Sequence, residues 1–227
     1  ADYLRGIGTY QIDLPNPTAG YKQYIEIQGA NHVATVNCNG RELGTHKGGF
    51  STFRYDLTPA MKAEGNVLVV TVSNGVSDIY PQNADFTFYG GLYRDVNIIA
   101  VNNSHFDLDY YGGPGLMVTP EVKGEDADVA VEVFLTNPAD GQELVYKIYD
   151  YEENVIAEVK QAVADTKAVI TIPKVHLWHG RKDPYLYRAE VALVKGDDVI
   201  DCVSAPFGCR TFKIDPENGF ILNGEEY

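Results

Sequence analysis

The chain has 227 residues, and 18 lysines and arginines against 32 aspartates and glutamates give a formal net charge of −14 at pH 7. The acidic residues are spread along the chain, which argues against nucleic acid and against an anionic membrane surface as partners. With 16 tyrosines, short runs of valine and isoleucine, frequent glycine and proline, and no long amphipathic stretch, the sequence predicts an all-β protein of two domains.

The first half of the chain has the pattern of a series of short strands. Residues 8–14 and 21–28 alternate apolar and polar side chains, and we expect them to pair as antiparallel strands. Residues 32–37 lead into Asn39-Gly40, a strong hairpin signal because both residues accept positive φ. Residues 66–73 are nearly continuous in apolar and β-branched side chains, which predicts a strand covered on both faces.

The longest irregular stretch, residues 74–89, runs directly into a pair of glycines. Loops of this length in compact β domains are usually functional or disordered, and its aromatic residues argue against disorder. Gly90 and Gly91 can adopt positive φ or allow another group to approach closely, so the loop can fold over one end of a sheet and hold a small ligand. Alternation along the following strand places Arg94 on the apolar side, where it needs a carboxylate partner. We therefore expect structural roles for Gly90, Gly91 and Arg94.

A second set of strands begins after the polar link Asn102-Asn103-Ser104. About eight short segments between residues 106 and 202, separated by turn residues, have the spacing of a β-sandwich. We therefore place a domain boundary between residues 103 and 104.

The cysteines and histidines do not form a recognisable metal or redox motif. Cys38, Cys202 and Cys209 are expected to be buried, reduced thiols, and a Cys202–Cys209 disulfide is the alternative. His176 and His179 are three residues apart, which in a β context places them on opposite faces without a third ligand. The sequence predicts no metal site and no cofactor.

Several ordered motifs run through both halves of the chain. The first half contains NHVATVNCNGRELGTHKGGFSTFRYDLT (31–58), NVLVVTVSN (66–74) and ADFTFYGGLYRDV (84–96). The second half contains LWHGRKDPYLYRAEVAL (177–193), FGCRTFKID (207–215) and GFILNGEEY (219–227). In this order the motifs resemble the first domain, and then the second domain and the exit from it, of glycoside hydrolase family 2, the β-galactosidase and β-glucuronidase family.

The resemblance implies a jelly-roll sugar-binding domain at residues 1–103, then an immunoglobulin-like β-sandwich at residues 104–213, then a barrel that hydrolyses a β-glycoside with retention of configuration. Residues 214–227 would begin the connection to that catalytic barrel, which this chain lacks, and no residue here is assigned a catalytic role. Members of the family usually have further strands before the segment that matches residues 6–14. The implied partners are a β-glycoside or oligosaccharide and the protein's own barrel. A homo-oligomer is also compatible with the sequence.

The resemblance also singles out individual residues. It implies that Asp85 reaches into the barrel's pocket and accepts hydrogen bonds from the sugar, whereas the rival interpretation pairs Asp85 with Arg94. Asn74 and Asp78 are second-rank candidates for substrate binding in the same loop. Trp178 is expected to be a packing residue of the second domain.

The sequence leaves two other functions open. One is a stand-alone carbohydrate-binding, lectin-like protein, and the other is a pair of structural domains from a surface protein. The sugar, the linkage and the oligomeric state are not determined, and periplasmic, secreted and cytoplasmic locations are all compatible with the sequence.

Overall fold

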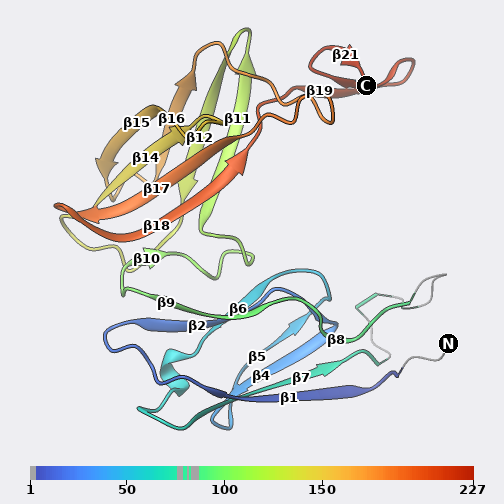
Figure 1. Ribbon diagram of the computed structural model, residues 1–227, viewed down its shortest axis with the longest axis vertical. Coiled ribbons are helices and arrows are strands. Elements are labelled where there is room, and N and C mark those ends of the chain that lie inside the picture. The colour runs from blue at the N-terminus through green and yellow to red at the C-terminus, as the bar shows by residue number, and fades with distance from the viewer. Residues whose placement is uncertain (1–3, 76–78, 81, 83–86) are drawn as a thin grey trace. The chain divides into compact units, whose positions relative to one another are not determined.

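The computed structural model describes residues 4–75, 79–80, 82 and 87–227, which divide into two compact units (Figure 1). The first unit contains residues up to Asn103 together with Leu108–Gly113, and the second contains Ser104–Asp107 and Pro114–Tyr227. In the described ranges the regular structure consists of β-strands and one 3₁₀ turn at Thr58–Ala60, which confirms the all-β class. None of the described residues belongs to a helix with the length and hydrophobicity needed to cross a membrane.

Two antiparallel sheets and a short strand pair form the first unit. One sheet has the order β1-β7-β4-β5, with bounds Ile7–Leu14, Asn66–Ser73, Val33–Cys38 and Arg41–Lys47. The other has the order β6-β2-β9, with bounds Phe53–Asp56, Lys22–Ile27 and Val96–Val101. The short pair joins β3 (Ala30–Asn31) to β8 (Gly91–Leu92).

Strand pairing in the first unit confirms one expectation and corrects another. β4 and β5 form the expected hairpin, with Asn39 at φ 52° and Gly40 at φ 82° in the turn. The expected pairing of residues 8–14 with 21–28 is wrong, because β1 pairs with β7 whereas β2 pairs with β6 and β9. The segment between β1 and β2 contains two prolines and a glycine, which favour irregular backbone and let the chain change sheets.

The core of the first unit lies between the inward faces of these sheets. Ile25 and Ile27 of β2 belong to one buried cluster with Leu68, Val70 and Val72 of β7. The alternate residues of β7 are half-buried, so the expectation of a strand covered on both faces is wrong. The inward face of β1 is more open: Tyr10 and Ile12, opposite buried Val70 and Leu68, are 42% and 61% exposed.

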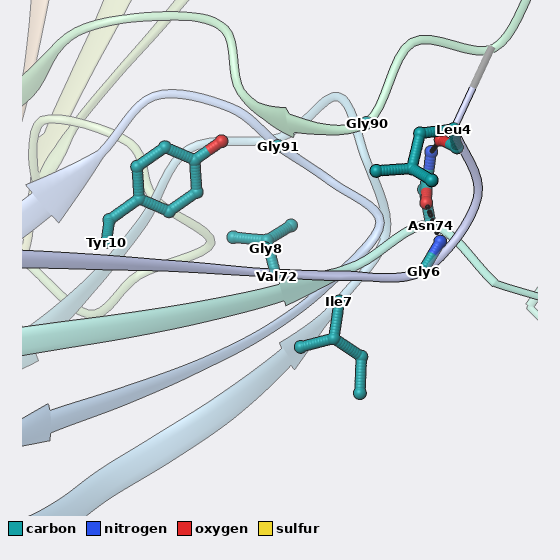
Figure 2. A pocket seen from close by; sticks show the side chains of 9 residues that line it. All are labelled: Leu4, Gly6, Ile7, Gly8, Tyr10, Val72, Asn74, Gly90 and Gly91. Atoms are coloured by element: carbon teal, nitrogen blue, oxygen red, sulfur yellow. Dashed lines mark hydrogen bonds between the residues drawn. The ribbon is translucent and has the colours of Figure 1, made fainter.

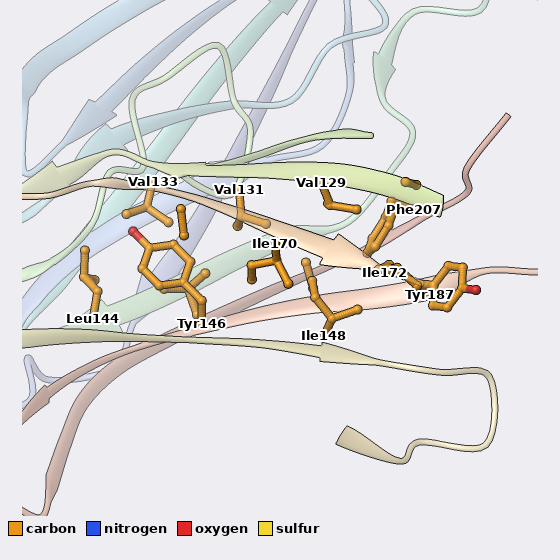
Figure 3. Close-up of a cluster of buried hydrophobic side chains, with 14 of the residues drawn as sticks. Val129, Val131, Val133, Leu144, Tyr146, Ile148, Ile170, Ile172, Tyr187 and Phe207 are labelled. Atoms are coloured by element: carbon orange, nitrogen blue, oxygen red, sulfur yellow. The ribbon is translucent and has the colours of Figure 1, made fainter. Parts of the chain in front are cut away.

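The second unit is a β-sandwich of seven main strands. One sheet has the order β11-β12-β16, with bounds Leu116–Lys123, Asp126–Val133 and Lys167–Ile172. The other has the order β15-β14-β17-β18, with bounds Val155–Ala162, Glu143–Tyr149, Tyr187–Lys195 and Asp198–Phe207. Figure 3 shows the core, where side chains of β12 and β16 meet Leu144, Tyr146 and Ile148 of β14. Alternate residues of β12, β14 and β16 are buried, as expected for strands with one face on a core.

Shorter elements complete the second unit. β10 (His105–Phe106) pairs with β13 (Leu135–Thr136). A three-stranded sheet ends the chain, with the order β19-β20-β21 and bounds Phe212–Asp215, Gly219–Leu222 and Glu225–Glu226.

All three cysteines are free thiols, so the alternative disulfide is not formed. Cys38 and Cys209 are fully buried as expected, and burial raises the pKa of Cys209 to about 11. The expectation is wrong for Cys202, which is exposed. It lies opposite half-buried Ala192 in the β17–β18 register, whereas the neighbouring Val191 and Leu193 point into the core.

Candidate functional site

The glycine pair at the start of β8 lies where other side chains approach the backbone closely. Gly91 has φ +86°, and a Cβ there would overlap the hydroxyl of Tyr10. A Cβ on Gly90 would lie 2.5 Å from Nδ2 of Asn74. The backbone N–H of Leu92 donates to the Tyr10 hydroxyl at 3.3 Å. Both positions therefore require glycine, which supports the structural roles predicted for them.

Asn74 lies beside these glycines, at the end of β7, and lines a cavity of about 190 Å³ (Figure 2). Its side chain is buried, its Oδ1 accepts from the N–H of Gly6 at 2.8 Å, and its Nδ2 donates to the carbonyl of Leu4 at 3.1 Å. The amide thus holds the segment that enters β1. Its predicted contact with substrate stays a prediction.

Arg94 differs from the expectation. The side chain is exposed, and Nη1 donates to the carbonyl oxygens of Phe50 at 3.1 Å and Gln28 at 3.4 Å. The chain bends at Arg94 between β8 and β9, so the alternation used to place it on the apolar side is interrupted. Among the described residues no carboxylate forms an ion pair with Arg94. Asp85 lies outside the described residues, so its pairing with Arg94 is untested.

The clearest candidate for ligand binding is a cavity of about 370 Å³ in the first unit. We call it the aromatic hollow, and its lining residues are Asn31, Phe50, Thr87, Phe88, Tyr89 and Tyr93. Three of its aromatic residues are exposed to solvent, since Phe50 is 62%, Tyr89 73% and Tyr93 42% exposed. The lining comes from segments far apart in sequence, which the fold brings together.

A hydrogen-bonded centre holds the loop side of the hollow in place. Asn31 is buried, its Oδ1 accepts from the Tyr80 hydroxyl at 2.7 Å, and its Nδ2 donates to the carbonyl of Tyr89 at 2.6 Å. The Tyr80 ring also packs on Phe50 and Phe88, with centroid distances of 5.9 Å and 6.4 Å. Burial raises the pKa of the Tyr80 hydroxyl, which stays a neutral donor.

The opposite side of the hollow is held by the segment between β8 and β9. The Tyr93 hydroxyl donates to the carbonyl of Gly49, and Arg94 donates to the carbonyl of the next residue, Phe50. A Cβ on Gly49 would lie 2.5 Å from Oδ1 of Asn31, so only glycine fits there. Arg94 therefore positions the aromatic ring of Phe50 through its backbone.

Next to this centre lies His32, whose side chain is fully buried. Burial lowers its pKa, and the side-chain nitrogen of Gln82 lies 2.7 Å from Nδ1. A neutral His32 thus helps to hold Gln82, two positions after Tyr80 in the same loop.

The remaining predicted site residues fall in two groups. Asp78 and Asp85 lie outside the described residues, so the structure does not test their roles. Trp178 is half-buried in the second unit, with the guanidinium of Arg210 4.7 Å from its ring centroid. A Cβ on Gly208 would lie 2.9 Å from Cβ of Trp178, and this close packing supports the predicted structural role.

The two histidines near Trp178 have separate partners. His176 Nε2 lies 2.6 Å from Oδ2 of Asp183, and its ring stacks on Tyr185 at 3.9 Å. His179 Nε2 lies 3.4 Å from Oε2 of Glu225. In the described part of the chain, no three His, Cys, Asp or Glu side chains gather as a metal site would require.

The sequence predicts a ligand loop at residues 74–89, which contains Tyr80, Phe88 and Tyr89, but the prediction misses Asn31, Phe50 and Tyr93. An aromatic residue that directly follows Gly48-Gly49 was a usable signal for Phe50, because glycine pairs in β proteins often mark close approach. Nothing local in the sequence identified Asn31.

Comparison with known proteins places both units in one family. Residues 4–102 match the family description "Glycosyl hydrolases family 2, sugar binding domain", and residues 115–210 match "Glycosyl hydrolases family 2". The chain belongs to glycoside hydrolase family 2. The resemblance seen in the sequence is thus confirmed, as is the order of a sugar-binding domain followed by an immunoglobulin-like sandwich.

Relatives in this family include enzymes of two specificities. A β-glucuronidase from Bacteroides fragilis is 34% identical over 99% of this chain and 34% of its own length. A β-galactosidase from Thermoanaerobacter pseudethanolicus is 28% identical over 91% of this chain and 28% of its own length. The chain therefore spans about a third or less of these relatives.

Solved structures agree with this assignment. An FMN-binding β-glucuronidase from Faecalibacterium prausnitzii L2-6 superposes with a TM-score of 0.92 at 40% identity, covering 99% of this chain and 36% of that one. A β-glucuronidase 2 from Bacteroides uniformis gives a TM-score of 0.89 at 31% identity, covering 100% of this chain and 29% of that one.

Proposed function

We propose that this chain is the non-catalytic, sugar-binding and immunoglobulin-like part of a retaining β-glycosidase of family 2. In this proposal the aromatic hollow and its loop contribute to the binding of a β-glycoside, and a catalytic barrel supplies the two carboxylates that retaining hydrolysis needs. The observation that carries the proposal is the Tyr80–Asn31–Tyr89 hydrogen-bonded centre, which holds open aromatic rings within the sugar-binding domain.

The proposed domains are residues 1–103 and 104–213, with residues 214–227 as the start of the connection to the barrel. The family matches, at 4–102 and 115–210, support this division. The segment 108–113 belongs to the first compact unit although it follows the proposed boundary.

Asp85 is proposed as the residue that accepts hydrogen bonds from the sugar. It lies two positions before Thr87, which lines the aromatic hollow, and its carboxylate can accept two hydroxyl groups at once. Asp78 precedes Tyr80 by two positions and stays a second-rank candidate together with Asn74.

The test of this proposal uses the complete enzyme. Hydrogen bonds to charged groups contribute about 1.5–3 kcal/mol, so we expect Asp85→Asn to lower kcat/KM by about 10- to 100-fold on the preferred β-glycoside. Asp13→Asn, on the exposed strand β1, is the matched control and should leave kcat/KM unchanged. An unchanged kcat/KM in Asp85→Asn would remove Asp85 from the site.

A second measurement separates this proposal from a lectin. The 227-residue chain alone should not hydrolyse an aryl β-galactoside or β-glucuronide, and it should show no saturable binding of a free sugar. Clear sugar affinity without the barrel would favour the stand-alone carbohydrate-binding function. Hydrolysis by the chain alone would contradict both.

A further inference from the structure

We propose that the aromatic hollow is a binding site for a planar aromatic ring, so that the protein takes β-glycosides whose leaving group is an aryl alcohol. The second half of this statement rests on the proposed function, whereas binding of the ring by this chain does not. The proposal depends on the size of the hollow, the chemistry of its lining and the way in which its rings are held.

The size of the hollow suits one or two fused rings. Its volume is about 370 Å³. Pockets for small ligands have volumes of roughly 300–1,000 Å³, and an apolar cavity of roughly 150 Å³ is enough for benzene. The hollow is therefore large enough for a bicyclic phenol but small for an oligosaccharide.

The lining favours an aromatic ligand over a sugar. Phe50, Phe88, Tyr89 and Tyr93 surround the hollow, and aromatic rings pack well against one another in offset or edge-to-face arrangements. A sugar needs partners for its hydroxyl groups, because polar groups removed from water without hydrogen bonds are destabilising. Among the polar side chains of the lining, the Asn31 amide already bonds Tyr80 and Tyr89, and the Tyr93 hydroxyl already bonds Gly49. The other hydroxyl groups of the lining are those of Thr87 and Tyr89, fewer than a sugar ring would need.

The rings are held before any ligand arrives. Tyr80 packs on both Phe50 and Phe88, and the backbone of Phe50 is bonded to Arg94. A site that is already ordered loses less conformational entropy on binding. Single exposed aromatic residues are common on protein surfaces, but three exposed aromatic residues around one hollow form a patch of the kind that marks a binding site.

The experiment titrates the purified chain with 4-methylumbelliferone, a bicyclic phenol, and with methyl β-D-galactopyranoside and methyl β-D-glucuronide. Binding is measured by saturation-transfer NMR and calorimetry. We expect saturable binding of 4-methylumbelliferone and none of the two methyl glycosides at the same concentrations. Binding of a methyl glycoside in preference to the phenol would overturn the proposal.

Variants then locate the bound ring. Phe50→Ala and Tyr89→Ala should each weaken binding at least 5-fold, because each removes one exposed wall of the hollow. Phe212→Ala in the second unit is the matched control, since Phe212 is 62% exposed, as Phe50 is. Circular dichroism and thermal unfolding show whether each variant is folded. Equal binding by all folded variants would place the ring elsewhere and overturn the proposal.

Two further outcomes separate this inference from its rivals. If the hollow is instead a protein interface, the chain should self-associate in sedimentation, Phe50→Ala should abolish association, and the phenol should not bind. This result would overturn the proposal.

The complete enzyme tests the aryl preference. There, Phe50→Ala should lower kcat/KM for an aryl glycoside more than for the corresponding methyl glycoside. Equal losses would overturn the aryl preference and leave the proposed function standing. If the chain binds the ring but the complete protein has no glycosidase activity, the ring-binding site stands and the proposed function is wrong.

Discussion

The carboxylate of Glu26 lies 2.7 Å from Nη2 of Arg54, and the two side chains are 11% and 8% exposed. Nη1 of the same guanidinium donates to the carbonyl oxygens of Leu108 at 3.0 Å and Gly113 at 2.7 Å. This buried ion pair thus joins strands β2 and β6 to the segment 108–113. The contact explains why that segment is part of the first unit although it follows the first residues of the second.

Loss of one partner of this pair should destabilise the first unit. Arg54→Met leaves the Glu26 carboxylate buried without its cation, and breaking a buried pair in this way costs about 3–5 kcal/mol. Hydrogen exchange, read by mass spectrometry across a series of urea concentrations, measures the change in the free energy of unfolding of β2 and β6. Trp178, the only tryptophan, reports the second unit by fluorescence, and its transition should not move. Lys123→Met, which breaks an exposed pair with Asp128, is the control and should change neither transition. An unchanged free energy of unfolding of the first unit in Arg54→Met would contradict this interpretation.

The same pair predicts how the first unit responds to acid. Burial alone would raise the pKa of Glu26, but hydrogen bonds from Asn97, Arg54 and Gln28 outweigh it and lower the pKa below its ordinary value of 4.5. Because the unfolded chain then binds the proton more tightly, this contribution to stability is fully present above pH 4.5 and is lost as the pH falls through the folded-state pKa. Urea midpoints of the first unit, measured between about pH 6 and pH 3, should fall more steeply for the wild type than for Glu26→Gln. Parallel curves would assign the acid sensitivity to other groups.

Local features of the sequence predicted the strands well, whereas their partners needed the fold. Asn39-Gly40 specifies its hairpin through two adjacent residues, so that turn was predictable. Alternation in residues 8–14 and 21–28 shows which side chains share a face but contains no information about which strand lies alongside. The pairing of β1 with β7 and of β2 with β9 is therefore visible only in the structure.

The candidate site was predictable in part for the same reason. The loop and its glycines were identified because glycine pairs and long aromatic loops are local signals, and Asp85 was identified through the family resemblance. Asn31, Phe50 and Tyr93 come from three separate segments that meet only after folding. The error at Arg94 has a local cause, since one bend in the chain reverses the face on which alternation places the next side chain.

Two glycines with similar backbone conformation offer a test of close packing at the site. Gly40 and Gly91 have φ of +82° and +86°, but a Cβ on Gly40 meets no atom within 4 Å, whereas one on Gly91 overlaps the Tyr10 hydroxyl. We expect Gly40→Ala to cost roughly 1–2 kcal/mol from the left-handed conformation alone, and Gly91→Ala to cost more. Tyr10→Phe should recover part of the loss in Gly91→Ala but none in Gly40→Ala, as a double-mutant cycle in urea would show. Equal losses without recovery would exclude the contact with Tyr10.

Thiol reactivity should distinguish the three cysteines in the native chain. Cys202 is exposed on β18, whereas Cys38 and Cys209 are fully buried. Burial raises the pKa of both buried thiols, that of Cys209 to about 11, so the reactive thiolate is scarce as well as inaccessible. Iodoacetamide at about pH 8 should therefore modify Cys202 alone, and the other two only after unfolding in urea, with peptide mass spectrometry as the readout.

The rate at Cys202 should itself depend on pH and on a neighbouring carboxylate. Neighbouring protein atoms remove part of the water around the Cys202 sulfur although the residue is exposed, and this desolvation, followed by the charges of Glu190 and Asp201, raises the pKa of its thiol. Its alkylation should therefore still accelerate between about pH 8 and pH 9. Glu190→Gln removes one of these negative charges and should increase the rate at pH 8. Asp140→Asn removes a negative charge from an exposed turn of the same unit and is the control. Rapid native-state alkylation of Cys38 or Cys209 would show that the core opens far more readily than its packing implies.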